Sequence, residues 1–380
     1  MEIITNKLFN IDLSFLKLKI NTVYTDNQIF RLHYRGMTVL LLAFSISVTA
    51  YQFFGEPIYC IQRDDIPEKL LNTYCWIEGT FTLPKAFNKK VGIEVVYPGV
   101  ETSEPEDQVV VHAYYQWVCF VLLFQAVLFY IPRYIWRSWE GGKIKKLCLE
   151  LTKPVLKREE KETQRDMLVN YFLDTNNNNG SYALRYFFCE IMNFINILGQ
   201  IYFTDYFLGQ EFTKFGPQVV KFTMTEQEER LDPMVKVFPR MTKCSFQKFG
   251  SSGDVQRHDA LCLLPLNIVN EKIFVVLWFC FVILAALTGL NVLYRLIFMV
   301  SSAARYTMLR SLCRFSYKDE IEKVLEKLSH GDYFILHLLA FNIHSAHMKE
   351  VISKLAEGLH GRKPSSAEES MRENSALSVP

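Results

Sequence analysis

Cysteine is the residue type whose number and spacing carry the most chemical information in this sequence. The 380-residue chain holds nine cysteines, four of which fall in two polar stretches between long apolar runs. Cys60 and Cys75 lie in the first stretch, and Cys244 and Cys262 lie in the second. Disulfides persist on the oxidising side of a membrane, so these four residues predict two disulfides. Four cysteines allow three connectivities, which leaves open a staple within each stretch or cross-links between the two stretches.

Metal binding and covalent catalysis have little support in the sequence. Neither cysteine pair has a C-x-x-C spacing, which disfavours a zinc site. His337, His344 and His347 lie near apolar residues, a pattern more typical of core histidines than of metal ligands. No Walker loop, GxSxG, HExxH or GxGxxG motif is present. We therefore predict no enzyme activity, no metal and no cofactor.

Four long apolar segments must position these residues. An α-helix crosses about 30 Å of hydrocarbon in about 20 residues, and core helices of soluble proteins rarely remain apolar on every face for that length. The third segment is the weakest because it contains Arg185, Glu190 and Asp205. A net charge of +2 also argues against a nucleic-acid partner. The four predicted transmembrane helices are 36–54, 109–131, 183–207 and 273–294.

Basic residues near the ends of these segments predict their orientation. They gather before the first, after the second, at the start of the third and after the fourth. All four groups lie on one side if both termini and the 132–182 loop are cytoplasmic. The 55–108 and 208–272 loops, which hold the four cysteines, are then extracellular. The predicted topology and the predicted disulfides therefore agree.

The remaining segments complete the predicted fold class, a mainly α membrane protein with four transmembrane helices. The extracellular region is expected to be a small, disulfide-stapled mixed α/β unit, with β-type runs at Gly92–Tyr97 and Val219–Met224. The 295–360 region is predicted to be helical and to form a cytoplasmic dome. The 361–380 tail is rich in Ser, Glu and Pro and is predicted to be disordered.

Polar side chains on two predicted helices could line a hydrated path. Residues 1–35 are predicted to form an amphipathic helix followed by a linker. The helix could lie on the inner leaflet of the membrane, or its polar stripe could face a pore. Hydroxyl and amide side chains recur along the first span, although small hydroxyls also bond between packed helices. Glu190 is interpreted as paired with Arg185, and Pro132 as a helix break. The pore-lining candidates from these patterns are Lys7, Asn10, Ser14, Lys17, Ser45, Thr49 and Gln52.

Several motifs resemble those of the innexins, the invertebrate gap-junction proteins. The predicted second span contains Tyr114-Tyr115-Gln116-Trp117-Val118, which is the signature of that family. The resemblance runs from about residue 21 to residue 359 and is closest to insect members. Further segments that resemble the family's span exits are 52–60, 130–136, 139–142, 205–212, 232–239 and 264–267.

The resemblance implies a large-pore channel that passes ions and small molecules between adjacent cells. Its expected partners are membrane lipid, a homo- or hetero-oligomeric ring of like subunits and an opposed hemichannel, at gap junctions of the plasma membrane. The resemblance also implies Cys60–Cys262 and Cys75–Cys244 disulfides, and it turns the amino-terminal polar stripe toward the pore. Glu56 would lie near the outer pore mouth. The alternative function is a non-conducting four-span adhesion or junction protein.

Overall fold

The computed structural model describes residues 23–61, 66–104, 106–148, 151–153, 157–224 and 233–361. The chain separates into two compact units. One unit contains residues 28–135 and 189–293, and the other contains the described parts of 1–27, 136–188 and 294–380. The pore candidates Lys7, Asn10, Ser14 and Lys17 lie outside the described residues, as does the predicted tail beyond Gly361.

Each of the four long apolar segments forms a helix. The first, predicted as 36–54, lies in a helical stretch that begins earlier, at Gln28. This stretch contains α2 (Gln28–Arg31), a π-helical turn over Leu32–Met37 and α3 (Thr38–Phe54). Within the described residues, three helical stretches are long and apolar enough to cross a membrane, and α8 does not meet that criterion. The other three long helices are α5 (Val118–Glu140), α8 (Gly180–Phe207) and α11 (Pro265–Val300).

The second helix differs from its predicted bounds at both ends. Residues Val110–His112 form strand β3 and Tyr114–Gln116 a 3₁₀ turn, so α5 begins at Val118 rather than at residue 109. Pro132 does not end the helix, which continues to Glu140. Proline removes its own N–H donor and one hydrogen bond of the helix. The residues on both sides of Pro132 keep the other backbone hydrogen bonds of the helix, so α5 continues.

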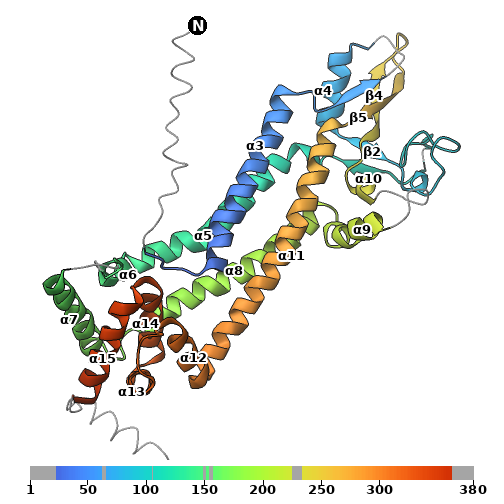
Figure 1. Ribbon diagram of the computed structural model, residues 1–380. Helices are drawn as coiled ribbons and strands as arrows, with labels where there is room; N and C mark the ends of the chain where they lie inside the picture. Colours follow the sequence, from blue (N-terminus) through green and yellow to red (C-terminus); the bar gives the residue numbers. More distant parts are fainter. Residues whose placement is uncertain are drawn as a thin grey trace, which may run out of the picture. The chain divides into compact units, whose positions relative to one another are not determined.

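A five-stranded antiparallel sheet caps the unit that contains α3 (Figure 1). Its spatial order is β1-β5-β4-β2-β3, and α4 (Glu68–Glu78) lies against β1 and β4. The first three strands in the chain are short, and the last two form a long hairpin. The strands are β1 (Tyr59–Ile61), β2 (Thr80–Thr82), β3, β4 (Met241–Phe249) and β5 (Val255–Leu263).

Both of the β-type runs predicted from sequence are wrong. Val219–Met224 belongs to helix α9 (Phe212–Met224), and Gly92–Tyr97 forms turns with only isolated bridges. In α9, Phe212, Val219 and Phe222 pack against the apolar core of the helices. Their spacing of seven and three residues places them on one helical face. Tertiary packing therefore overrides the local strand preference of the valines.

The other unit is built from helices around a nearly fully buried α14 (His330–Asn342). Ion pairs join α7 (Arg158–Asp174) to α15 (Ser345–Gly361), with Lys161–Glu350 at 2.6 Å and Lys354–Asp166 at 2.7 Å. Burial raises the pKa of Cys148, with a smaller contribution from nearby Glu140, to about 12, so its thiol is unreactive at neutral pH. The other helices are α6 (Lys143–Cys148), α12 (Ser302–Leu312) and α13 (Lys318–Lys327).

Candidate functional site

Two disulfides clamp the sheet. Cys60 on β1 is bonded to Cys262 on β5, and these two residues are direct partners across the antiparallel pair. Cys75 on α4 is bonded to Cys244 on β4. Each bond joins the 55–108 loop to the 208–272 loop, as the resemblance implied. The sulfur atoms of Cys60, Cys75 and Cys262 lie within 4.8 Å of one another. They offer no thiolate to a metal because each is already in a disulfide.

The two loops also share the sheet. Strands β1 and β2 come from the first loop and flank the β4–β5 hairpin, which comes from the second loop. The Lys243 Nζ atom lies at the seam, donating to the Glu101 carbonyl at 2.9 Å and lying 3.5 Å from Asp259. Covalent and hydrogen-bonded links therefore make one folded unit from the two loops.

The Tyr114–Val118 segment links this sheet to α5. Tyr115 is fully buried, and its hydroxyl donates to the Cys75 carbonyl at 3.3 Å. The Gln116 amide donates to the carbonyls of Trp76 and Ile77. The last four carbonyls of a helix have no partner within the helix. The two side chains therefore cap the carboxyl end of α4.

Tyr114 makes a second link from the same segment. Its hydroxyl donates to the Val237 carbonyl at 3.1 Å, and its ring meets the rings of Phe207 and Phe238 edge-on. Phe207 is the last residue of α8, and Phe238 directly follows α10 (Pro233–Val237). Val118 is fully buried at the start of α5, whereas Trp117 is exposed. Three neighbouring side chains thus hold the ends of α4, α8 and α10 around the start of α5.

The pore candidates on α3 occupy different environments. Ser45 is buried and donates to the Cys119 carbonyl on α5 at 2.9 Å, so its hydroxyl serves helix packing. The Thr49 hydroxyl donates to the Ser45 carbonyl of its own helix. Gln52 is partly buried beside the Cys119 thiol. Glu56 is exposed, two residues beyond the end of α3.

Helix α8 buries several polar residues and leaves several large apolar residues exposed. Glu190 is buried and accepts a hydrogen bond from Asn291 on α11 at 3.1 Å. Arg185, its predicted partner, lies instead over the Trp139 ring. Farther along α8, Thr204 accepts a hydrogen bond from Gln125 on α5 at 2.8 Å. The buried polar residues include Glu190, Asn193, Gln200 and Thr204, and the exposed apolar residues include Ile191, Ile195, Leu198, Tyr202 and Tyr206.

Comparison with known proteins assigns the chain to a family. The innexin family model matches residues 26–359. The chain is 50% identical to Innexin inx2 of Schistocerca americana over 347 residues, which cover 91% of this chain and 96% of that protein. It is 49% identical to Innexin inx2 of Drosophila melanogaster over 345 residues, which cover 90% of this chain and 94% of that protein. It is 44% identical to Innexin shaking-B of the same species over 352 residues, which cover 91% of this chain and 95% of that protein. The chain belongs to the innexin family.

The family assignment confirms the resemblance drawn from the signature and its flanking motifs. Innexins are gap-junction channel proteins of the plasma membrane and are not enzymes. In this innexin, the sequence pattern alone did not reveal what the signature residues contact. The signal in the sequence was Gly79, because glycine commonly follows the last turn of a helix. In the structure α4 ends at Glu78, and Gly79 has a φ of 92°.

The buried ring and the capping hydroxyl of Tyr115 lead to a specific prediction. Replacing Tyr115 with alanine is expected to destabilise this innexin by about 3–5 kcal/mol, because it empties a fully buried aromatic site. Tyr115→Phe keeps the ring against Trp76, at a centroid separation of 4.5 Å, and loses only the hydroxyl. We expect that variant to lose about 1 kcal/mol. Thermal unfolding of the purified variants measures both losses, and equal losses would contradict the packing argument.

Proposed function

We propose that this innexin is a subunit of a large-pore gap-junction channel or hemichannel that passes ions and small molecules between adjacent cells. The observation that carries the proposal is the family match over residues 26–359, which includes all four long helices and both cysteine-bearing loops. The clamped sheet supports the proposal, because docking to an opposed hemichannel needs a rigid surface. Ring assembly, lipid contact and docking are parts of the same proposal.

The α8 pattern supports a fourth membrane span. A helix in a water-filled environment buries its apolar face, whereas α8 buries Glu190 and Asn193 and leaves Ile195 63% exposed. An exposed apolar face is stable against lipid or a neighbouring subunit. The buried polar residues lower the mean hydropathy of α8, which explains why it falls short of the criteria that the other three helices meet. With four spans, both termini lie on one side.

Epitope tags on the two sides of α8 test the four-span topology. A tag between the exposed Asn177 and Asn178, just before α8, should be reachable only in permeabilised cells. A tag at Ser251–Gly253, in the turn of the β4–β5 hairpin, should be reachable in intact cells. If both tags are reachable from the same compartment, α8 does not cross the membrane. A tag at Pro380 should be reachable only in permeabilised cells, since we place both termini in the cytoplasm.

Glu56 is proposed to contribute to cation preference at the outer pore mouth. One carboxylate from each subunit would form a ring of negative charge where α3 ends. Glu56→Gln removes that charge, and we expect the cation-to-anion permeability ratio of hemichannels to fall by roughly twofold or more. Reversal potentials in salt gradients measure the ratio. Glu78→Gln, which removes a charge from the carboxyl end of α4, should leave the ratio unchanged.

Paired oocytes that express the chain test the channel proposal itself. Junctional current and dye transfer should appear when both cells express compatible subunits. Surface-exposed protein that yields adhesion without current or dye transfer, with any partner subunit, would instead support the non-conducting adhesion alternative. Surface labelling in the same cells separates that outcome from a failure of trafficking.

A further inference from the structure

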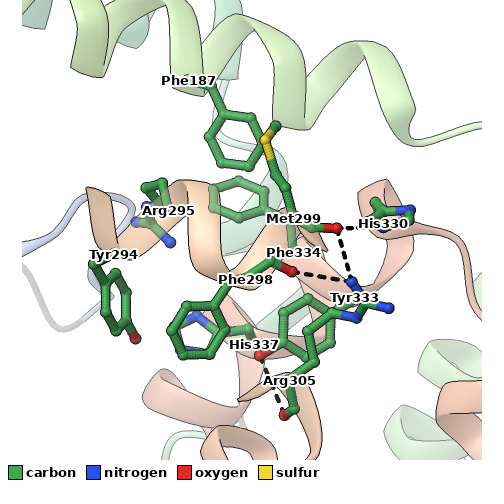
Figure 2. A pocket seen from close by; sticks show the side chains of 10 residues that line it. All are labelled: Phe187, Tyr294, Arg295, Phe298, Met299, Arg305, His330, Tyr333, Phe334 and His337. Atoms are coloured by element: carbon green, nitrogen blue, oxygen red, sulfur yellow. Dashed lines mark hydrogen bonds between the residues drawn. The ribbon is translucent and has the colours of Figure 1, made fainter. Parts of the chain in front are cut away.

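A small cavity lies where the carboxyl end of α11 meets α12 and α14 (Figure 2). Its volume is about 30 Å³, large enough for a few polar atoms. Two arginines and two histidines line it, together with aromatic rings and Met299. None of the described residues that line it is Asp or Glu. The composition favours an anionic ligand with an apolar portion.

Two basic side chains are held in place by the end of α11. Figure 2 shows the Arg305 guanidinium and the His330 ring converging on the Met299 carbonyl, at 3.2 Å and 3.0 Å. Arg305 also donates to the Phe298 carbonyl at 3.0 Å. Both bonds from Arg305 use its Nη1 atom, so the other guanidinium nitrogens keep their donors. These bonds position Arg305 before any ligand arrives, which lowers the entropy cost of binding.

Arg295 adds a second guanidinium to the cavity wall. It lies against the rings of Tyr186, Phe187 and Phe334, with distances of 5.4–5.9 Å to their centroids. The carboxyl end of α11 contributes only about −0.5 of an elementary charge, and the amino end of α12 beside it contributes about the opposite amount. The charges of Arg295 and Arg305 therefore dominate, and the cavity is positive.

His337 lines the same cavity with an available polar atom. Its Nε2 atom is buried and has no hydrogen-bond partner among the described residues. Burial, with a smaller contribution from the charge of Arg295, lowers the pKa of His337 to about 4. The ring is neutral at pH 7, and one of its nitrogens carries a proton. In the tautomer that carries this proton on Nε2, the atom would donate a hydrogen bond to a ligand oxygen at this position.

The position of the cavity along the chain indicates the source of the ligand. Tyr294 is the last residue of the predicted 273–294 span, so Arg295 to Met299 follow the hydrocarbon by about one turn. Ile297 and Val300 in the same stretch are 56% and 88% exposed and offer an apolar surface. On the cytoplasmic side, basic pockets at this depth meet the headgroups of anionic lipids.

We propose that this cavity binds the phosphate group of an anionic phospholipid from the cytoplasmic leaflet. Arg305 and His337 contact the phosphate oxygens, Arg295 supplies positive potential, and the lipid tail lies along α11. The choice of leaflet rests on the topology given under the proposed function, whereas the phosphate chemistry rests on the cavity alone. The bound lipid would join α11 to α12 and α14 and stabilise their packing.

Native mass spectrometry of the purified full-length chain in detergent tests the proposal. Three probes are titrated in separate experiments: phosphatidylserine as an anionic lipid, phosphatidylcholine as a zwitterionic lipid, and inorganic phosphate as the free anion. We expect phosphatidylserine to bind at least roughly tenfold more tightly than the other two. Equal binding of both lipids would overturn the proposal. Inorganic phosphate that binds as tightly as phosphatidylserine would overturn the lipid as the source.

Three variants locate the binding site. Arg305→Gln should weaken phosphatidylserine binding by roughly tenfold, and Arg305→Lys should restore most of it because the charge is retained. His337→Phe keeps a ring of similar size and should weaken binding severalfold, which separates ligand contact from loss of folding. Arg310→Gln, on the exposed side of the same helix, removes an equal charge and should bind normally. Unchanged binding by both cavity variants would overturn the site.

The binding measurement does not depend on conduction. A chain that binds phosphatidylserine but yields no junctional current would contradict the proposed channel and leave the lipid site intact. A chain that conducts but does not discriminate between the lipids would contradict the lipid site alone.

Discussion

Replacing Cys60 with serine is expected to reduce junctional conductance between paired oocytes to the level of uninjected cells. Strand β1 has only three residues and lies at the edge of the sheet that the structure describes, where it pairs with β5. The Cys60–Cys262 bond is the covalent anchor of this short strand. The bond spans 202 residues of chain, and loss of a native disulfide typically costs about 2–5 kcal/mol. Against a total stability of about 5–15 kcal/mol, that loss is large. Dual voltage clamp measures the conductance.

Two further variants separate the disulfide from a general effect of losing a cysteine. Cys280 is a free cysteine on α11, and Cys280→Ser should conduct normally. The Cys60→Ser, Cys262→Ser double variant leaves no unpaired thiol from this bond and should still fail. Surface biotinylation reports how much protein reaches the membrane. Normal coupling by Cys60→Ser would show that the clamp is dispensable.

Replacing Gly331 with alanine is expected to destabilise the helical unit around α14 by about 3 kcal/mol. A Cβ atom at Gly331 would lie 2.5 Å from the backbone carbon of Asn179 and from the nitrogen of Gly180. Backbone atoms cannot rotate away as a side chain can. Asn179 is also held by Asp332, whose carboxylate accepts from its amide at 2.7 Å. The close approach is therefore fixed from both sides.

Thermal unfolding of the purified chain measures the effect of Gly331→Ala. The matched control is Gly180→Ala, because a Cβ atom at Gly180 would meet no atom within 4 Å. We expect the control to unfold within about 0.5 kcal/mol of the parent chain. If both variants unfold at the parent temperature, Asn179 can move, and the packing of α14 is looser than the structure indicates.

The long apolar helices and the family could be predicted from sequence because both depend on residues that are contiguous in the chain. The length of an apolar run is set by the bilayer thickness, and the signature at Tyr114–Val118 is contiguous. The cysteines at 60, 75, 244 and 262 were predicted to form disulfides because they lie in the predicted extracellular loops. Composition and spacing alone left three connectivities open. The family resemblance supplied the pairing, and the structure contains the same two bonds.

Several parts of the site depended on contacts between distant residues. Ser45 has the composition and spacing of a pore-lining residue, yet it is buried against α5. Val219–Met224 has the composition of a strand, yet it packs as part of α9. Pro132 has the chemistry of a helix terminus, yet α5 continues past it. For Val219–Met224 and Pro132, tertiary packing outweighed a local preference of about 1–3 kcal/mol.

By itself, the amino-acid sequence determined that this innexin has long apolar segments, two cysteine-bearing loops and a family signature. Each of those features is a pattern along the chain. Bilayer thickness, an oxidising compartment and common ancestry relate directly to such patterns, so no tertiary contact is needed to recognise them. Only the tertiary structure decided that Tyr115 and Gln116 cap α4, that the two loops share one sheet, and that several polar residues of α8 are buried. Arg305 and His337 likewise reach one cavity only through folding. Such contacts join residues far apart in the chain, and their free energies exist only once the helices and strands have packed.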